Sequence, residues 1–307
     1  MAGRLEGKVA IVTGAGRGIG RGEALALAEE GAAVVVNDLG GSTAGEGADK
    51  TPAENVVGEI KAIGGKAVAN YADVSDYDAC EAMVKQALDE FGRLDILVNN
   101  AGILRDRMVF NMSEAEWDIV VAVHMKGTFN TIKHASIVFR QQRSGRIINT
   151  SSSSGLGNAG QTNYAAAKEG IVGITRTVAR DLGRYGVTCN ALRPGAATRL
   201  VMSPEMEAAR KAAEARGETR RGGMGGTASM DPDRIGPFVA YLASDEAQNI
   251  NGRDFMIRGN AVGLYTIPTL EAVVYSPGES WTNDDMFNVF PETIGRTLKN
   301  EFGSKEG

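Results

Sequence analysis

The sequence has 307 residues, of which 43% are hydrophobic and 23% charged, an ordinary composition for a globular protein with a sizeable core. Its formal net charge of −5, without a long basic run, argues against a dedicated nucleic-acid binder. Two cysteines exclude a disulfide framework, and two histidines are too few for a histidine-rich metal centre. No apolar stretch approaches the ~20 residues that span a bilayer. Residues 1–7 lack a signal-peptide core and residues 304–307 are no peroxisomal address, so we expect a reduced, cytoplasmic compartment.

Short apolar runs alternate with helical periodicity along most of the chain. Strands are predicted at residues 8–12, 33–37, 66–71, 94–99, 145–150, 187–192 and 254–257. Helices are predicted at residues 19–30, 53–63, 83–91, 114–141, 163–185 and 233–244. This order is typical of right-handed βαβ units. It predicts an α/β fold with a mostly parallel, doubly wound sheet covered by helices on both faces.

Two segments interrupt this alternation. Residues 40–52 are polar and rich in glycine, and their length for a loop indicates function or mobility. From residue 265 the alternation stops. The apolar residues Trp281, Phe287 and Phe290 argue against free coil there, so we expect this segment to pack on the body or on another subunit. We therefore predict one domain over residues 1–264 and a C-terminal extension over 265–307.

A glycine-rich turn follows the first predicted strand, in residues 13–20 (TGAGRGIG). Glycines let backbone amides approach a pyrophosphate closely, and the N-terminus of the following helix favours its negative charge. The spacing Gly-x3-Gly-x-Gly departs from the usual Gly-x-Gly-x-x-Gly fingerprint, and turns need glycine in any case. The position of the turn between strand and helix nevertheless predicts a dinucleotide site that includes Gly14, Arg17, Gly18 and Ile19.

Asp38 follows the second predicted strand, about 20 residues after the glycines. A carboxylate at this place accepts hydrogen bonds from the adenosine ribose and repels a 2′-phosphate, which predicts NAD and not NADP. Arg17, within the turn, would weaken that preference. The alternative role of Asp38 is to cap a helix or a turn.

Tyr164 and Lys168 are spaced four residues apart, on one face of the helix predicted at 163–185. A phenol with its ordinary pKa of about 10 is a poor base at neutral pH, but a nearby cation lowers that pKa. A tyrosine tuned in this way can exchange a proton with an alcohol or a carbonyl. The pair alone is equally compatible with two ordinary surface residues, so its surroundings decide.

The glycine turn, the Tyr164–Lys168 pair and the serines at 151–154 together resemble the short-chain dehydrogenase/reductase family, whose fold is a Rossmann-type α/β domain. Short motifs similar to those of the same family also follow the third, fourth and sixth predicted strands. The resemblance covers about residues 7–262. Besides the glycine turn and Asp38, the cofactor-binding residues that it implies are Asp73, Val74, Asn100, Ala101, Gly102, Tyr164, Lys168, Pro194, Gly195 and Thr198.

Three stretches, residues 34–41, 64–71 and 99–107, are more narrowly similar to the dehydrogenase part of the peroxisomal multifunctional enzyme type 2 family. That resemblance implies NAD-dependent oxidation of a (3R)-hydroxyacyl-CoA, or of a 17β-hydroxysteroid, which some members accept. The hydratase and sterol-carrier parts are missing from this sequence, so we expect a stand-alone dehydrogenase. The resemblance also implies a homodimer or homotetramer formed through the helices predicted at 114–141 and 163–185.

By the same resemblance, Tyr164 is the catalytic acid/base, and Lys168 binds the nicotinamide ribose and lowers the tyrosine pKa. A serine would hydrogen-bond the substrate oxygen. The common family spacing of thirteen residues before Tyr164 points to Ser151, whereas the strand end and Gly155 point to Ser152. We prefer Ser152, because loops tolerate deletions better than strand ends do.

His124 stands where the family usually has a fourth catalytic residue, an Asn. The peroxisomal subgroup is similar to this chain in having His there, so the difference does not imply an inactive enzyme. An imidazole can hold a water or a backbone carbonyl. A relay role and a buried structural role are equally compatible with the sequence.

Residues 199–230 fit the family's substrate-covering loop. Its methionines suit an acyl chain or a steroid and its basic residues suit CoA phosphates, although a solvated mobile loop explains both equally well. The leading hypothesis is an NAD-dependent dehydrogenase of a secondary alcohol, with a 3-hydroxyacyl-CoA as substrate. The alternatives are a dehydrogenase of a hydroxysteroid or another bulky alcohol, and a non-catalytic dinucleotide-sensing protein. The intact Tyr164–Lys168 pair argues against the last.

Overall fold

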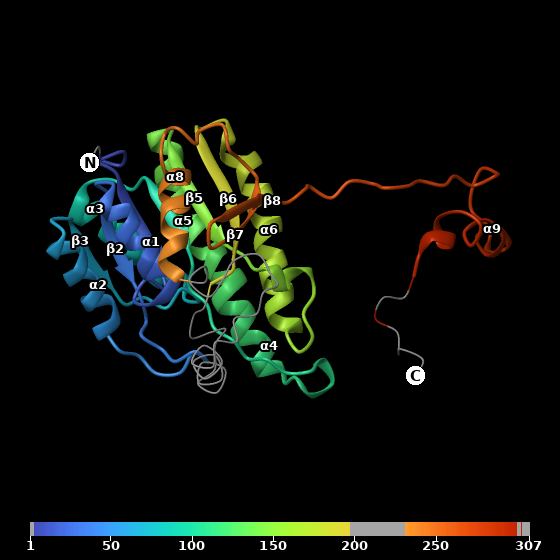
Figure 1. Cartoon of the computed structure of the whole chain (residues 1–307), viewed down its shortest axis with the longest axis horizontal. Helices are drawn as coiled ribbons and strands as arrows, with labels where there is room; N and C mark the ends of the chain where they lie inside the picture. Colours follow the sequence, from blue (N-terminus) through green and yellow to red (C-terminus); the bar gives the residue numbers. More distant parts are fainter. Residues whose placement is uncertain (1–2, 197–230, 300–301, 303–307) are drawn as a thin grey trace, which may run out of the picture. The chain divides into compact units, whose positions relative to one another are not determined.

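The structure is a computed structural model that describes residues 3–196, 231–299 and 302 (Figure 1). Thr198 and the predicted substrate loop at 199–230 lie outside the described residues. The chain divides into two compact units, Met1–Tyr265 and Thr266–Gly307, which we describe separately. Among the helices of the described ranges, none is both long and apolar enough to cross a membrane.

An eight-stranded sheet forms the centre of the first unit, with the strand order β3-β2-β1-β4-β5-β6-β7-β8. The first seven strands pair in parallel, and β8 pairs antiparallel with β7. The connections reverse direction between β1 and β4, and such a switch point leaves a crevice at the carboxyl ends of the strands. The strands are β1 (Val9–Thr13), β2 (Ala33–Asn37), β3 (Ala67–Asn70), β4 (Ile96–Asn99), β5 (Gly145–Thr150), β6 (Val187–Pro194), β7 (Asp254–Arg258) and β8 (Ala261–Leu264).

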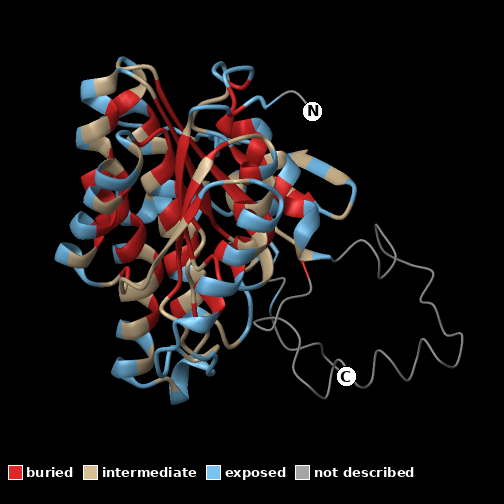
Figure 2. Ribbon diagram, turned by 90° about the vertical axis from the view of Figure 1, so that its left-hand side faces the viewer, coloured by how far each residue is buried: buried red, intermediate tan, exposed pale blue. Residues whose placement is uncertain are grey.

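Helices cover both faces of this sheet. One apolar core packs α1, α2 and α8 on the first face, and a second core packs α3, α5 and α6 on the other. Figure 2 shows the buried residues in the strands and on the inward helix faces, while the outward faces are exposed. Because both faces are covered, the central strands read as continuous apolar runs. The helices are α1 (Gly18–Glu29), α2 (Thr51–Ala62), α3 (Tyr77–Phe91), α4 (Glu114–Val121), α5 (Gly127–Gln142), α6 (Thr162–Gly183) and α8 (Gly236–Ala243).

The predicted doubly wound α/β fold is confirmed, with two differences in its elements. The helix predicted at 114–141 is α4 and α5 joined by a π-helical segment, η2 (Ala122–Lys126), a rare form that often marks functional sites. The antiparallel strand β8 has no counterpart in the prediction. Its four residues are too short for a clear alternation, and Gly263 weakens the strand signal.

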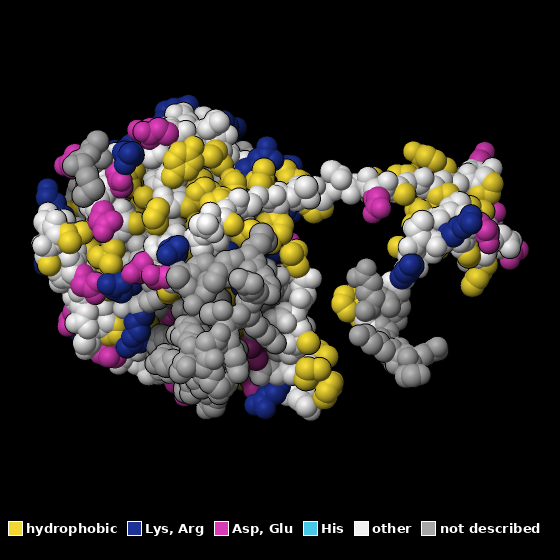
Figure 3. Space-filling view, in the orientation of Figure 1, with side chains coloured by type: hydrophobic (Ala, Val, Ile, Leu, Met, Phe, Trp, Pro, Cys, Tyr) yellow, Lys and Arg dark blue, Asp and Glu magenta, His cyan; other side chains and the backbone are white. Residues whose placement is uncertain are grey.

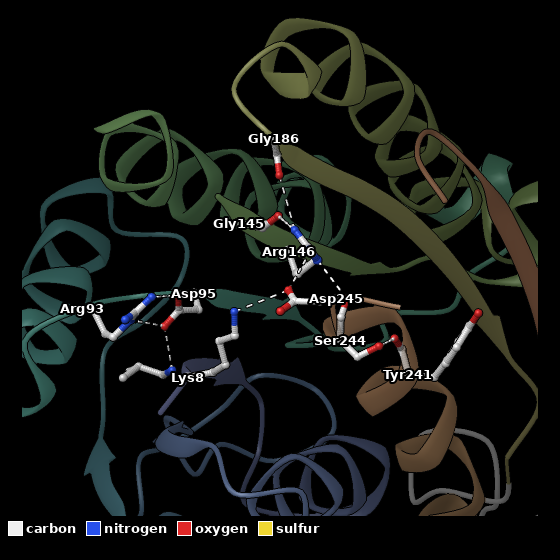
Figure 4. A network of polar contacts seen from close by, with 10 residues as sticks. Lys8, Arg93, Asp95, Gly145, Arg146, Gly186, Tyr241, Ser244 and Asp245 are labelled. Atoms are coloured by element: carbon white, nitrogen blue, oxygen red, sulfur yellow. Dashed lines mark hydrogen bonds and ion pairs between the residues drawn. The ribbon is translucent and has the colours of Figure 1, made fainter. Parts of the chain in front are cut away.

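A polar network ties together the amino ends of β1, β4 and β5 (Figure 4). Arg146 of β5 is 5% exposed, donates from Nε to the Ser244 carbonyl at 3.1 Å, and lies 3.1 Å from the Asp245 carboxylate. Asp95, before β4, accepts from the Val9 amide at 3.0 Å and pairs with Arg93. These bonds satisfy charges that burial would otherwise penalise. They fix the end of the sheet that lies opposite the crevice.

In the second unit, residues 266–299 include a short helix, α9 (Asn283–Val289), and a 3-10 turn, η6 (Ile294–Thr297). The Thr282 side chain caps α9 in a capping box with Asp285. Large apolar side chains of this unit are exposed, with Tyr275 at 82% and Phe287 at 83%. The expectation that this extension packs on the body or on another subunit therefore stays a prediction.

Candidate active site

A cavity lies at the carboxyl ends of β1, β2 and β4, at the switch point of the sheet. It has a mixed polar and apolar lining, as ligand pockets usually do. Most of the residues predicted to bind a cofactor share this one cavity. They are Gly14, Arg17, Gly18, Ile19, Asp38, Asp73, Val74, Asn100, Ala101 and Gly102.

The glycine turn forms one wall of the cavity, and its shape requires glycine. Gly14 has a φ of +64°, and a Cβ there would lie 2.8 Å from the Ala101 Cα. Helix α1 begins directly after the turn, and its N-cap residue Arg17 makes no side-chain capping bond. The first amides of the helix therefore keep their hydrogen-bonding capacity for an anion. The turn fits the pyrophosphate of a dinucleotide.

Thr13 and Asn100 fasten this turn to the end of β4. The Thr13 hydroxyl accepts from the amides of Asn100 and Ala101 at 3.0 and 3.1 Å. The side-chain amide of Asn100 donates to the backbone carbonyls of Thr13 and Gly14 at 3.0 and 3.1 Å. Asn100 thus holds the glycine turn in place. Thr13 was not among the predicted site residues, and only its position at the end of the first strand could have indicated it.

The Asp38 carboxylate binds the backbone of the glycine turn and of the loop after β2. Its two oxygens accept from the amides of Gly16 and Gly40, each at 2.7 Å, and the residue is 8% exposed. Asp38 therefore does cap local turns, but it also lines the cavity. Arg17 lies beside it and forms a longer ion pair with Asp49 at 3.9 Å.

Asp73 and Val74 line the cavity at the end of β3. The Asp73 carboxylate accepts from the Ser75 amide and hydroxyl, both at 2.8 Å. The Val74 carbonyl accepts from the side-chain amide of Asn130 at 2.9 Å, which joins this loop to α5. These bonds fix the loop after β3 at the wall of the cavity.

Tyr164 and Lys168 lie one turn apart on α6, as their spacing predicts. Lys168 is 3% exposed, and its Nζ donates to the Thr150 carbonyl at 2.6 Å and lies 5.5 Å from the centre of the tyrosine ring. Burial lowers the pKa of Lys168 to about 7, against the opposing effect of the Glu23 carboxylate. The buried ammonium is therefore stabilised by a hydrogen bond to the Thr150 carbonyl and, more weakly, by the carboxyl group of Glu23.

The pKa of Tyr164 is raised above its ordinary value. Burial is the main cause, and the negative charge of Asp106 adds to it. A hydrogen bond with Ser152 acts in the opposite direction. The expectation that Lys168 lowers the tyrosine pKa stays a prediction.

The structure gives Ser151 and Ser152 different surroundings. Ser151 is 1% exposed, and its hydroxyl donates to the Lys168 carbonyl at 2.8 Å, so it ties β5 to α6. The Ser152 hydroxyl accepts from the Ser154 amide at 3.1 Å and is near enough to Tyr164 to lower the pKa of its phenol. Ser152 is therefore the serine whose hydroxyl shares space with the tyrosine.

Arg193 holds the backbone of Ser152 in place. It is 2% exposed, pairs with Asp254 and Glu169 at 2.8 Å each, and donates to the Ser152 carbonyl at 2.8 Å. This positioning role was not predicted, because a buried arginine leaves no periodic signal in a sequence. Pro194 ends β6 and Gly195 follows it, and neither residue lines the cavity.

His124 is 1% exposed in the π-helical segment, and its ring meets the Tyr164 ring edge-on with 5.1 Å between centroids. Its Nε2 lies 3.0 Å from the Ile103 nitrogen and 2.8 Å from the Ile103 oxygen, so either neutral tautomer bonds to that residue. Burial, with the Lys168 charge, lowers the pKa of His124 to about 3. A neutral imidazole thus holds the Ile103 backbone beside the tyrosine.

The comparisons with known proteins agree with this geometry. Residues 8–210 match the family model described as short chain dehydrogenase. The chain belongs to the short-chain dehydrogenase/reductase family. A crystal structure of a short chain dehydrogenase from Mycobacterium avium is 39% identical, covers 96% of this chain and 97% of its own, and superposes with a TM-score of 0.79.

Two curated relatives narrow the comparison. The hydroxyacyl-CoA dehydrogenase ChsB1 of Mycobacterium tuberculosis is 40% identical over 98% of this chain and 90% of its own length. The peroxisomal multifunctional enzyme type 2 of Mus musculus is 41% identical over 91% of this chain, but the match spans only 35% of that protein. The predicted resemblance to this subgroup is confirmed. The chain is accordingly an oxidoreductase that acts on CH–OH groups, in a family that uses nicotinamide dinucleotides.

Replacing His124 with Asn should make the protein less sensitive to acid. Folded His124 stays neutral down to about pH 3, whereas in the unfolded chain it binds a proton below its ordinary pKa of about 6.5, so stability falls as the pH drops through that value. Between pH 6.5 and 5 we expect the free energy of unfolding of the wild-type protein to fall by about 2 kcal/mol more than that of His124→Asn. Urea unfolding at several pH values measures this, and parallel curves for the two proteins would contradict it.

Proposed function

We propose that the protein uses NAD to oxidise a secondary alcohol to a ketone, with a 3-hydroxyacyl-CoA as the physiological substrate. The observation that carries this proposal is the grouping of Ser152, Tyr164 and Lys168 in a fold whose cavity is lined by the glycine turn and Asp38. The chain is also 40% identical, over almost its whole length, to a hydroxyacyl-CoA dehydrogenase. An intact acid/base group of this kind disfavours a purely sensing role.

The three side chains divide the chemistry between them. Ser152 donates a hydrogen bond to the substrate oxygen and holds it against Tyr164. Tyr164 accepts the hydroxyl proton of the alcohol, and Lys168 offsets the negative charge that the phenolate would carry. When bound, the dinucleotide supplies the acceptor for the hydride that leaves the same carbon. One proton and one hydride leave the alcohol, and a ketone results.

The surroundings of Asp38 support NAD over NADP. A carboxylate at this place repels a 2′-phosphate and can accept from ribose hydroxyls. Arg17 could attract that phosphate, but it lies within ion-pair distance of Asp49, which offsets part of its charge. The balance of charges around the adenosine end of the cavity is therefore unfavourable to a phosphate.

An apolar rim near Tyr164 supports a substrate with an apolar portion. Met108, Val109 and Phe110 are 47%, 65% and 77% exposed, and Figure 3 shows apolar side chains gathered at the α4 end of the molecule. The Arg107 amide donates to the Gly160 carbonyl at 2.7 Å, so the rim is joined to the segment that leads to Tyr164. An acyl chain and a steroid would both suit such a rim.

Initial rates with purified protein test the activity. We expect NAD to be reduced with a 3-hydroxyacyl-CoA at a higher kcat/KM than with a 17β-hydroxysteroid, and NAD to be preferred over NADP. Both enantiomers of the acyl-CoA should be used, with the Tyr164→Phe variant as control. Turnover of steroids alone would replace the substrate by the second candidate, and a preference for NADP would refute the cofactor assignment.

We further propose that the protein forms a homodimer or homotetramer through α5 and α6. The apolar side chains Phe129 and Ile137 of α5 are 50% and 43% exposed, which suits a helix face that a second copy covers. Light scattering measures the mass in solution. A monomer at all concentrations would contradict the proposal.

A further inference from the structure

The long loop at 40–52 has no role in the chemistry above. It runs from the end of β2 into the first residues of α2 and forms part of the cavity wall. Three of its residues line the cavity: Gly41, Ser42 and Gly45. The loop is held on both sides, because the Leu104 amide donates to the Thr43 carbonyl at 3.0 Å and the Asp49 amide donates to the Leu39 carbonyl at 3.1 Å. It is therefore a fixed wall of the dinucleotide site.

The C-terminal end of this loop packs against the glycine turn and Asp38. The Gly40 amide donates to the Asp38 carboxylate at 2.7 Å, and a Cβ on Gly40 would lie 1.8 Å from the Asp49 carbonyl oxygen. A Cβ on Gly16 would lie 2.7 Å both from the Asp38 carboxylate and from the Pro52 Cβ. Glycine permits such close approaches of the backbone. The start of α2 is thereby placed beside the acid that lines the cavity.

Arg17 is the cation of this cavity. Within the described part of the chain, the charged residues of its lining are Arg17, Asp38 and Asp73. The Arg17 side chain is 40% exposed, and its Nη2 lies 3.9 Å from the Asp49 carboxylate. A guanidinium group binds phosphate well, so an unpaired arginine here would attract the 2′-phosphate of NADP.

The Asp49 carboxylate is held in place and charged. It accepts from the Thr51 amide at 3.0 Å, at the N-terminus of α2, where the N-cap residue Lys50 makes no side-chain capping bond. Hydrogen bonds from Thr51 lower the pKa of Asp49, and the Arg17 charge acts in the same direction. Asp49 is therefore ionised near neutral pH and faces Arg17 from a fixed helix end.

The neighbouring cations have other partners. Arg21, one turn later on α1, pairs with Glu59 of α2 and with Asp233 before α8. The Lys50 ammonium lies 4.9 Å from the centre of the Tyr71 ring, and Lys50 does not line the cavity. Neither cation is therefore an alternative partner for a phosphate in the cavity.

We propose that Asp49 is a specificity-determining residue for the dinucleotide, which acts by neutralising Arg17 and so withholds that cation from a 2′-phosphate. The proposal rests on the proposed function, in which NAD is the cofactor. Asp38 repels the phosphate directly, whereas Asp49 weakens the attraction of the cation that would bind it. The long loop is the element that brings this second carboxylate to the cavity.

The dissociation constants of NADH and NADPH test the proposal without turnover, measured at low ionic strength by the fluorescence of the reduced nicotinamide. Asp49→Asn removes the charge but keeps a side-chain oxygen for the Thr51 amide. We expect this variant to bind NADPH about fivefold more tightly than the wild-type protein does, and NADH with less than about a twofold change.

Glu46→Gln is the matched control. It removes a carboxylate of the same loop that pairs with Arg105 at 2.9 Å and not with Arg17, so it should bind both nucleotides as the wild-type protein does. Equal changes for NADH and NADPH in Asp49→Asn, or the same gain for NADPH in Glu46→Gln, would overturn the proposal.

The Arg17→Gln background separates neutralisation of Arg17 from direct repulsion by Asp49. If Asp49 acts through Arg17, Asp49→Asn should no longer tighten NADPH binding in this background. A gain of the same size would overturn the proposal. The wild-type protein tests the proposed function separately, because tighter binding of NADPH than of NADH would refute the NAD assignment. An unchanged ratio of the two constants in Asp49→Asn would refute only the role of Asp49.

Discussion

A lysine ammonium placed in the dry interior is the constraint on which the rest of the site depends. Lys168 is 3% exposed, and its Nζ has one hydrogen bond, to the Thr150 carbonyl at 2.6 Å. A charge in such a place is stable only if its surroundings supply opposite charge or polar contacts. The Thr150 carbonyl at the end of β5 supplies such a contact.

The doubly wound sheet is what brings these groups together. Parallel strands place their carboxyl ends at one edge, and the reversal between β1 and β4 opens the crevice there. The glycine turn leads into α1 on one face of the sheet, and α6 brings Tyr164 and Lys168 from the other. The opposite edge is fixed by the Arg146 network, so the edge with the cavity is free to carry the chemistry.

The repetitive parts of the fold could be predicted from the sequence, since buried parallel strands are short apolar runs. The strand at 33–37 was predicted with the bounds that β2 has. The π-helical segment at His124 could not be predicted, because one extra residue in a helical turn barely changes the apolar spacing. Thr198 and the loop at 199–230 lie outside the described residues, so their predicted roles are unchanged.

The site was predicted in its residue types but not in its electrostatics. The sequence favoured Ser152 over Ser151, and in the structure Ser151 donates to the Lys168 carbonyl whereas Ser152 acts on the Tyr164 phenol. The pKa of Tyr164 could not be predicted, because desolvation depends on packing from other elements.

The most direct measurement follows the hydrogen that is transferred. A 3-hydroxyacyl-CoA carrying deuterium at C3 would be incubated with NAD and the protein, and the reduced dinucleotide analysed by mass spectrometry. We predict that the label appears on the dinucleotide with the wild-type protein, and that Tyr164→Phe, which still binds the dinucleotide, shows almost none. If the label stays on the acyl-CoA, or is lost to water, with both enantiomers, the result would contradict hydride transfer at this site.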